Sequence, residues 1–89
     1  MPSISLFYGI VVYMYYKDFE KHHLPHIHVK YQEYTATISI TNGEILSGKL
    51  PNKQPKMVQV WIDIHQEDLL LNWDLAVAGE TPYRIEPLR

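Results

Sequence analysis

The feature that most constrains the fold is a strict alternation of apolar and polar residues between His26 and Ile40. Successive side chains of a β-strand point to opposite faces, so the alternation predicts two strands that are each apolar on one face. If Gln32 and Glu33 form a two-residue turn, every apolar residue of one strand lies opposite an apolar residue of the other. The expected pairs are Ile27 with Ile38, Val29 with Ala36, and Tyr31 with Tyr34.

A second hairpin is expected at Asn42-Gly43. A two-residue turn at this point would place Leu46 opposite Ser39 and turn the following strand to the wrong face. A three-residue loop, Thr41 to Gly43 with Gly43 in the left-handed conformation, keeps the apolar face continuous. This loop predicts the pairs Ile38 with Leu46 and Ala36 with Gly48.

The segment before these hairpins also favours a strand, because residues 4–16 are rich in Val, Ile, Tyr and Phe. Gly9 is expected to mark a bulge or bend that divides this strand into a short arm and a main part. A polar loop from Lys17 to Pro25 then leads into the alternating region.

Apolar residues at helical spacing predict one long helix from Met57 to Ala78, or about 53–78 with its first turn. Asn52 or a neighbour is expected to cap the helix, with Pro55 in the first turn and Gly79 just after the end. The buried stripe should contain Val58, Trp61, Ile62, His65, Leu69, Trp73 and Ala76, flanked by Met57, Val60, Ile64, Leu71 and Leu75. The last residues, 80–89, should form an extended arm that packs through Tyr83, Ile85 and Leu88.

These elements predict a single α+β domain over residues 1–89. Its sheet is an antiparallel meander of about four strands, about 4–50, packed on one long C-terminal helix with an extended arm beyond it. A domain of this size has a small core, so self-association into a homo-oligomer, for example a dimer, is expected.

Charge and composition narrow the function classes. The formal net charge is -2, so the chain lacks the strongly basic surface of a protein that wraps a nucleic-acid backbone. The absence of cysteine excludes disulfide and thiolate chemistry and suits the cytoplasm. The sequence shows no signal peptide, and its longest apolar run, Leu6 to Tyr16, is too short to span a bilayer, so no membrane association is expected.

The polar face of the sheet is the candidate binding surface. Its cations, imidazoles, hydroxyls and aromatic rings suit an anionic, nucleotide-like ligand or an RNA backbone. The candidates are His26, His28, Lys30, Thr35, Thr37, Ser39, Ser47 and Lys49, joined by Tyr13 or Tyr15. The alternative is a solvated sheet face, since antiparallel sheets commonly expose one side to water.

Two further hypotheses involve His26 and His28, which should project from the same side of one strand. As metal ligands they would need partners from Asp18, Glu20, His22 or His23. This is not the ligand set of a recognised motif, so neither a metal nor a cofactor is assigned. As acid and base beside Lys30, the two imidazoles would make a metal-independent RNase. The sequence does not decide whether the protein is an enzyme.

Four polar or aromatic residues of the helix are assigned to the core or to an interface. Trp61 and Trp73 should pack in the core, with a dimer interface as the alternative. His65 is expected at a core or interface position. Asn72 lies at the edge of the apolar stripe and is expected to cap or bond a sheet terminus.

An ordered set of short motifs covers almost the whole chain and resembles the domain-of-unknown-function family four-one-six-zero. The resemblance consists of Pro2-x-Ile4-Ser5-x-Phe7-Tyr8-Gly9-Ile10, Pro25-His26-x-His28-Val29-x-Tyr31-x-x-Tyr34, Gly48-Lys49-Leu50-Pro51, Val60-Trp61-x-x-x-His65-x-x-x-Leu69-x-x-Asn72-Trp73-x-Leu75-Ala76, Gly79 and Ile85-x-Pro87-Leu88. The chain departs from the family at Gln32, where a turn glycine is usual, and in the approach to His26 at Lys21 to Leu24. The second departure argues against metal binding through His22 or His23.

The resemblance implies a small bacterial or archaeal protein, often encoded beside another small domain of unknown function in an arrangement like a toxin–antitoxin pair. It carries over no catalytic residue. The expected function is a small cytoplasmic interaction protein of such a module, which contacts a cognate small protein or RNA. The alternatives are a nucleotide-like ligand sponge or sensor that uses the His/Lys sheet face, and the metal-independent RNase.

Overall fold

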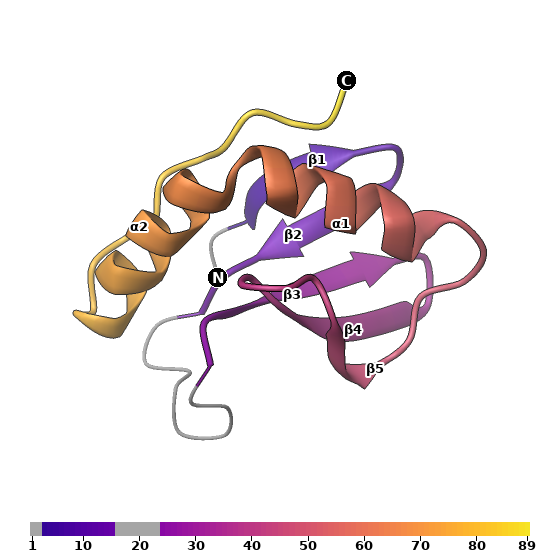
Figure 1. Ribbon diagram of the computed structural model, residues 1–89, viewed down its shortest axis with the longest axis horizontal. Helices are drawn as coiled ribbons and strands as arrows, with labels where there is room; N and C mark the ends of the chain where they lie inside the picture. Colours follow the sequence, from indigo (N-terminus) through magenta and orange to yellow (C-terminus); the bar gives the residue numbers. More distant parts are fainter. Residues whose placement is uncertain (1–2, 16–23) are drawn as a thin grey trace.

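The computed structural model describes residues 3–15 and 24–89. Within these residues, a five-stranded antiparallel sheet in the order β1-β2-β3-β4-β5 is followed by two helices (Figure 1). The elements are β1 (Ser3–Phe7), β2 (Ile10–Tyr13), β3 (His26–Tyr31), β4 (Tyr34–Ser39), β5 (Ile45–Gly48), α1 (Gln54–Ile64) and α2 (Gln66–Val77). The α+β class is confirmed. The expected four strands and single helix differ from this arrangement in detail.

The additional strand arises at Gly9. Tyr8 and Gly9 both have positive φ, 49° and 78°, and Phe7 pairs with Ile10. Two consecutive left-handed residues form the tight hairpin turn whose twist matches that of antiparallel strands. Gly9 therefore reverses the chain instead of bending one strand, and the expected bulge or bend at this position is wrong.

The hairpin of β3 and β4 has the predicted register. Ile27 pairs with Ile38, Val29 with Ala36, and Tyr31 with Tyr34. Gln32 adopts the left-handed conformation, with φ 55°, although it is not a residue that favours it. The pairing of apolar residues on one buried face is thus sufficient to fix the register.

The hairpin of β4 and β5 has the predicted register only in the half that lies far from the loop. Ala36 pairs with Gly48 as expected, but Ile38 pairs with Ile45, and Leu46 is the extra residue of a bulge. The loop has four residues, 40–43, because the Ser39 N–H donates to the Glu44 carbonyl at 2.9 Å. The fully buried Ile40 instead donates its N–H to the Pro25 carbonyl at 2.9 Å, which lengthens the β3–β4 pairing.

The predicted helix is bent at His65, whose φ of -108° and ψ of 26° separate α1 from α2. Hydrogen bonds from the His65 N–H to Trp61 and from the Leu69 N–H to His65 continue across the bend. The first helix begins after Lys53, which has no side-chain capping bond, so Asn52 is not the cap. At the other end, Gly79 follows the last turn with φ 83°, as predicted.

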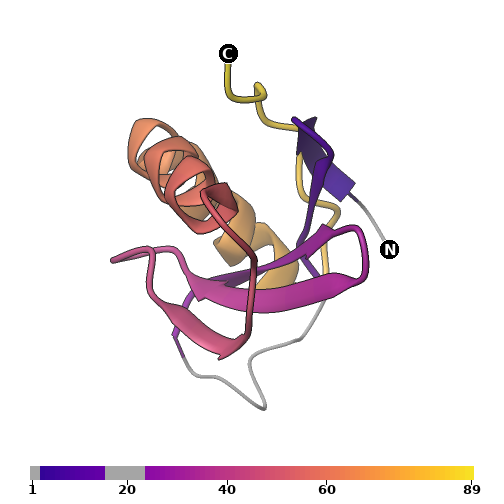
Figure 2. The same cartoon turned by 90° about the vertical axis from the view of Figure 1, so that its right-hand side faces the viewer.

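The helices lie on the concave side of the strongly curled sheet (Figure 2). The six apolar residues of the predicted stripe are all buried there, and Trp61 contacts Phe7 with ring centroids 5.3 Å apart. His65 is only half-buried. No helix among residues 3–15 and 24–89 is long and apolar enough to cross a bilayer.

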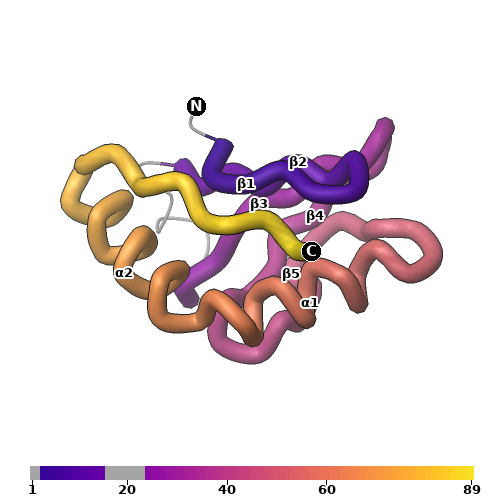
Figure 3. Tube along the Cα trace, turned by 90° about the horizontal axis from the view of Figure 1, so that it is seen from above, coloured from indigo at the N-terminus to yellow at the C-terminus, as the bar shows by residue number. Residues whose placement is uncertain are grey.

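The C-terminal segment runs beside β1 (Figure 3), where the Ile85 N–H donates to the Ile4 carbonyl at 2.7 Å. The Trp61 indole N–H holds the same segment through the Glu86 carbonyl, also at 2.7 Å. Ile85 is buried and Leu88 is half-buried, as predicted. Tyr83 is 68% exposed, so the expected packing of this side chain is wrong.

Candidate functional site

The polar face of the sheet is hollowed by a groove of about 380 Å³, which we call the outer groove. It spans β2, β3, β4 and β5 and continues onto the residues that follow β2. The lining side chains are Tyr13, Tyr15, His28, Lys30, Thr35, Thr37 and Ser47, with Val29, Ala36 and Gly48 completing the surface.

Strand register brings these residues together. Tyr13 lies opposite His28, His28 opposite Thr37, and Thr37 opposite Ser47, so one row of polar side chains crosses four strands. The pair Lys30 and Thr35 forms part of a second row on the same face. Because alternate residues of each strand share a face, residues distant in sequence meet on one surface.

His28 is held between a hydroxyl and an aromatic ring. Its Nδ1 lies 3.4 Å from the Thr37 hydroxyl oxygen, a long hydrogen bond. The ring of Tyr15 approaches from the other side, with centroids 4.3 Å apart, and is itself stacked on Tyr13 at 6.4 Å. The groove therefore presents two phenol rings and an imidazole close together.

His26 occupies a different environment from the one expected. It lies on the same side of β3 as His28, with ring centroids 5.2 Å apart, as parity predicts. However, it is only 1% exposed, because Trp73 of α2 packs over it at 4.8 Å. A ring contact of this kind also orients the imidazole, whose Nδ1 lies 2.8 Å from the Leu24 carbonyl oxygen. His26 contacts His28 but does not line the outer groove.

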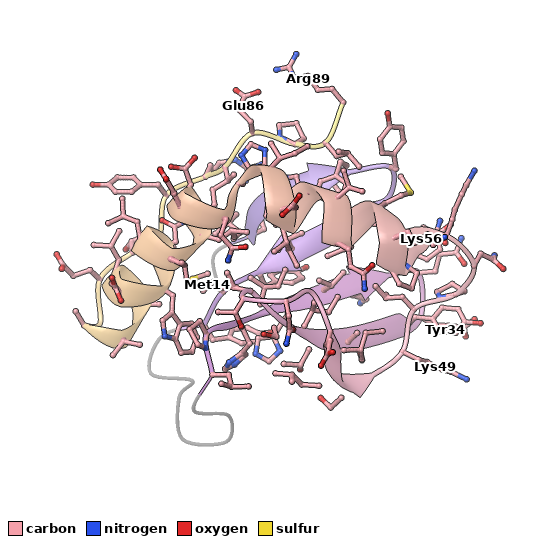
Figure 4. The ribbon with its side chains drawn as sticks, viewed as in Figure 1. Met14, Tyr34, Lys49, Lys56, Glu86 and Arg89 are labelled. Atoms are coloured by element: carbon pink, nitrogen blue, oxygen red, sulfur yellow. The ribbon has the colours of Figure 1, made fainter. Side chains whose placement is uncertain are left out.

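Two other candidates also lie outside the groove. Ser39 is fully buried, with its hydroxyl 2.9 Å from that of Thr41. Lys49 is exposed and extends past the Tyr34 ring, with Nζ 6.0 Å from the centroid (Figure 4). The expected cationic face is therefore narrower than predicted, and Lys30 is the cation that lines the outer groove within the described residues.

Comparison with protein families gives a match over most of the chain. The family model described as Domain of unknown function (DUF4160) matches residues 9–74, about three quarters of the chain. The chain belongs to the DUF4160 family. Every residue that lines the outer groove falls within the matched DUF4160 region, whereas β1 and the C-terminal segment lie outside it. Comparisons of this DUF4160 chain with curated proteins and with solved structures find no match.

The metal hypothesis gains no support from the described part of this DUF4160 chain. Residues 3–15 and 24–89 contain no group of three or more His, Cys, Asp or Glu side chains placed to hold an ion. The further ligands considered, Asp18, Glu20, His22 and His23, lie outside the described residues. The hydroxyls and rings that line the outer groove are suited to hydrogen bonding and ring stacking.

The helix residues singled out from the sequence lie in the core or beside it. Trp61 and Trp73 are buried, and the half-buried His65 contacts Trp61 with ring centroids 5.6 Å apart. Asn72 bonds the C-terminal segment and not a strand end: its amide donates to the Tyr83 carbonyl at 2.7 Å and accepts from the Tyr83 N–H at 3.0 Å.

Sequence reasoning did not assign Gly48 to the site. Its φ is 76°, and a Cβ atom built on it would lie 2.2 Å from the Thr35 carbonyl oxygen. The absence of a side chain lets the end of β5 approach β4 and form one wall of the groove. Parity predicts the pairing of Gly48 with Ala36, but it gives no signal for the positive φ of Gly48 or for this close approach.

Proposed function

We propose that the protein binds one nucleotide unit, a base with its phosphate, in the outer groove. The observation that carries this proposal is the row of Tyr13, His28, Thr37 and Ser47 across four strands, with Tyr15 and Lys30 beside it. Together, the row and these two neighbours combine a stacking surface, a cation and hydroxyl groups within one groove.

The two ends of a nucleotide require different chemistry, and the groove offers both kinds. Stacking on an aromatic ring contributes about 1–3 kcal/mol per base and tolerates any base. The rings of Tyr13, Tyr15 and His28 supply this surface. Lys30 and the hydroxyls of Thr35 and Ser47 are the donors that a phosphate requires.

Size and charge favour a single unit over a long strand. The volume of about 380 Å³ is near the lower end of the range for small-ligand sites. A backbone with many phosphates would need several cations, whereas the chain has a net charge of -2. The ligand is therefore a free nucleotide or one exposed nucleotide of an RNA.

The test is calorimetric titration with AMP, UMP, the matching nucleosides and a short single-stranded RNA. We expect the nucleotides to bind and the nucleosides to bind at least about tenfold more weakly, because Lys30 loses its anionic partner. Tighter binding of the RNA than of either mononucleotide would assign the site to an RNA strand, and equal or weaker binding to a free nucleotide.

Variants locate the site. Tyr15→Ala and Lys30→Met should each weaken AMP binding about tenfold, through lost stacking and lost charge pairing. Lys49→Met removes the same charge outside the groove and should leave AMP binding unchanged. The proposal fails if AMP and UMP do not bind, or if Lys30→Met and Lys49→Met have equal effects.

We also propose that the protein acts with a cognate small protein in a cytoplasmic toxin–antitoxin-like module. The support is the set of large aliphatic side chains that the helices expose, Val60, Ile64, Leu71 and Val77. Co-expression with the product of the adjacent gene should give a stable complex that suppresses toxicity, and gel filtration of each protein alone reports whether either self-associates.

The RNase hypothesis stays a prediction, tested by RNA cleavage that is lost in His28→Ala and unaffected by chelator.

A further inference from the structure

A second groove lies away from the outer groove and shares none of its lining residues. This helix groove has a volume of about 390 Å³ and runs between the start of α1, the β1–β2 turn and the last residues of the chain. Its floor consists of Tyr8, Met57, Val60 and Leu88, and its rim consists of Lys53, Lys56 and Arg89.

The floor is apolar and open to solvent. Tyr8 is 59% exposed and Val60 is 51% exposed, while Met57 and Leu88 pack against the core and are half-buried. Covering such a surface with another apolar side chain is favourable, at roughly 25 cal/mol per Å² buried. The floor thus offers a place for one apolar anchor.

The rim carries three of the chain's eight Lys and Arg residues, although the chain as a whole is negatively charged. Lys53 and Lys56 lie at the N-terminal end of α1, whose first turn contains no acidic residue. The positive end of the helix dipole disfavours cations at this position and favours anions. No Asp or Glu side chain lines the groove within the described residues, so the positive charge of the lysines has no carboxylate beside it there.

Arg89 retains hydrogen-bonding capacity despite its ion pair with Glu86. The guanidinium hydrogen bonds the Glu86 carboxylate and lowers its pKa, but both side chains are largely exposed. A guanidinium has five N–H groups, so one such contact leaves most of them available. Figure 4 shows Lys56 and Arg89 extending outward from different elements.

From these features we propose that the helix groove docks an acidic amphipathic peptide segment of a partner protein. One apolar side chain of the segment enters the floor, and flanking carboxylates pair with the lysines and Arg89. An RNA strand is disfavoured because the floor offers one aromatic ring and few hydrogen-bonding groups. A concave floor also suits a protruding side chain better than a flat lipid surface.

The inference is independent of nucleotide binding, and it gives the proposed module a defined contact site. If the peptide binds but co-expression gives no complex, the adjacent gene product is excluded as the partner and the groove remains a peptide-docking site. Loss of the peptide interaction alone would overturn the groove assignment.

The probe is a short fluorescein-labelled helical peptide with leucines along one face and glutamates on the other, measured by fluorescence anisotropy. One control peptide has lysine in place of every glutamate, and the other has serine in place of every leucine. We expect each control to bind at least about tenfold more weakly, because both the charges and the anchor contribute.

Variants of the full chain assign the binding to this groove. The double variant Lys53→Glu/Lys56→Glu and the single variant Val60→Ser should each weaken peptide binding at least about tenfold, whereas Lys49→Glu should not. These positions are exposed, and glutamate is favoured at a helix N-terminus, so folding should be retained. Circular dichroism verifies this.

Three results would overturn the proposal. The first is no binding of the leucine–glutamate peptide, and the second is equal weakening by Lys49→Glu and by the double variant. The third is stronger association with vesicles of anionic phospholipid than with the peptide, lost in the double variant, which would assign the groove to a membrane surface.

Discussion

At the scale of single residues, Gly48 has the most restrictive environment near the outer groove. Its φ of 76° is strained for any residue with a side chain, and an added Cβ would also lie 2.9 Å from the Ala36 Cα atom. The neighbouring Lys49 N–H donates to the Thr35 carbonyl at 3.0 Å, which holds the strands close. This backbone contact leaves no room for a methyl group.

We therefore predict that Gly48→Ala lowers the free energy of unfolding by about 1–3 kcal/mol, measured by urea denaturation. Ser47→Ala, at the adjacent exposed position, is the control and should change it by less than about 0.5 kcal/mol. Equal stabilities of Gly48→Ala and the unaltered protein would show that β5 relaxes away from β4 at little cost.

His26 and His28 show how far residue-level reasoning reaches. Alternation places both imidazoles on the same side of β3, and the ring contact between them agrees. Alternation does not indicate what lies above that side. Trp73 of α2, the helix that follows the bend at His65, packs over His26, and no local pattern in the sequence predicts that bend.

At the scale of elements, the C-terminal segment has no regular secondary structure and depends on side chains of the helices. Asn72, which is almost fully buried, makes a reciprocal pair of hydrogen bonds with the backbone of Tyr83. Trp61 holds the segment further along the chain, through Glu86. An extended segment without a strand partner leaves its backbone N–H and C=O groups unpaired. The side chains of Asn72 and Trp61 supply partners for some of these groups.

We predict that Asn72→Ala lowers the free energy of unfolding by about 1–3 kcal/mol, because it leaves two backbone groups without partners. Asn72→Asp should also destabilise the protein, since it keeps the acceptor but loses the donor to the Tyr83 carbonyl. Hydrogen exchange should increase at Tyr83 and Ile85 in Asn72→Ala, whereas the Tyr83 N–H should stay protected in Asn72→Asp, which keeps its acceptor.

Asp74→Ala, on the exposed side of the same helix, separates this effect from helix propensity and should be nearly neutral. Unchanged exchange at Ile85 in Asn72→Ala would mean that the Ile85 bond to Ile4 holds the segment without help from Asn72.

The sequence predicts a hairpin more accurately when both the apolar pairing and the turn fix its register than when only one of them does. The β3–β4 register is fixed by apolar pairing and by a short turn, and it was correct. The β1–β2 hairpin was missed because Tyr8 is not a typical left-handed residue, so the segment resembled one long strand. The bulge at Leu46 occurs together with the burial of Ile40 in the core, a tertiary effect that the loop sequence does not reveal.

At the scale of the whole molecule, the curled sheet separates two surfaces of different chemistry. The outer groove is polar and aromatic, and the helix groove has an apolar floor with a cationic rim. The sequence indicated the first surface through strand parity. The second brings together residues from the start, the middle and the end of the chain, and only tertiary structure places them side by side.

One core cluster connects both helices, apolar residues of β1, β2, β3 and β4, and Ile85, so the molecule should unfold as one cooperative unit. Trp61 in α1 and Trp73 in α2 lie on either side of the bend at His65, and each reports on one helix. We predict that the urea transitions followed by tryptophan fluorescence in Trp61→Phe and in Trp73→Phe each coincide with the transition followed by circular dichroism in the same variant. The argument depends on the shared core, because hydrogen bonds across the bend alone would allow α2 to separate first. An earlier fluorescence transition in Trp61→Phe, which retains Trp73, would show that α2 and the cover over His26 open independently of the sheet.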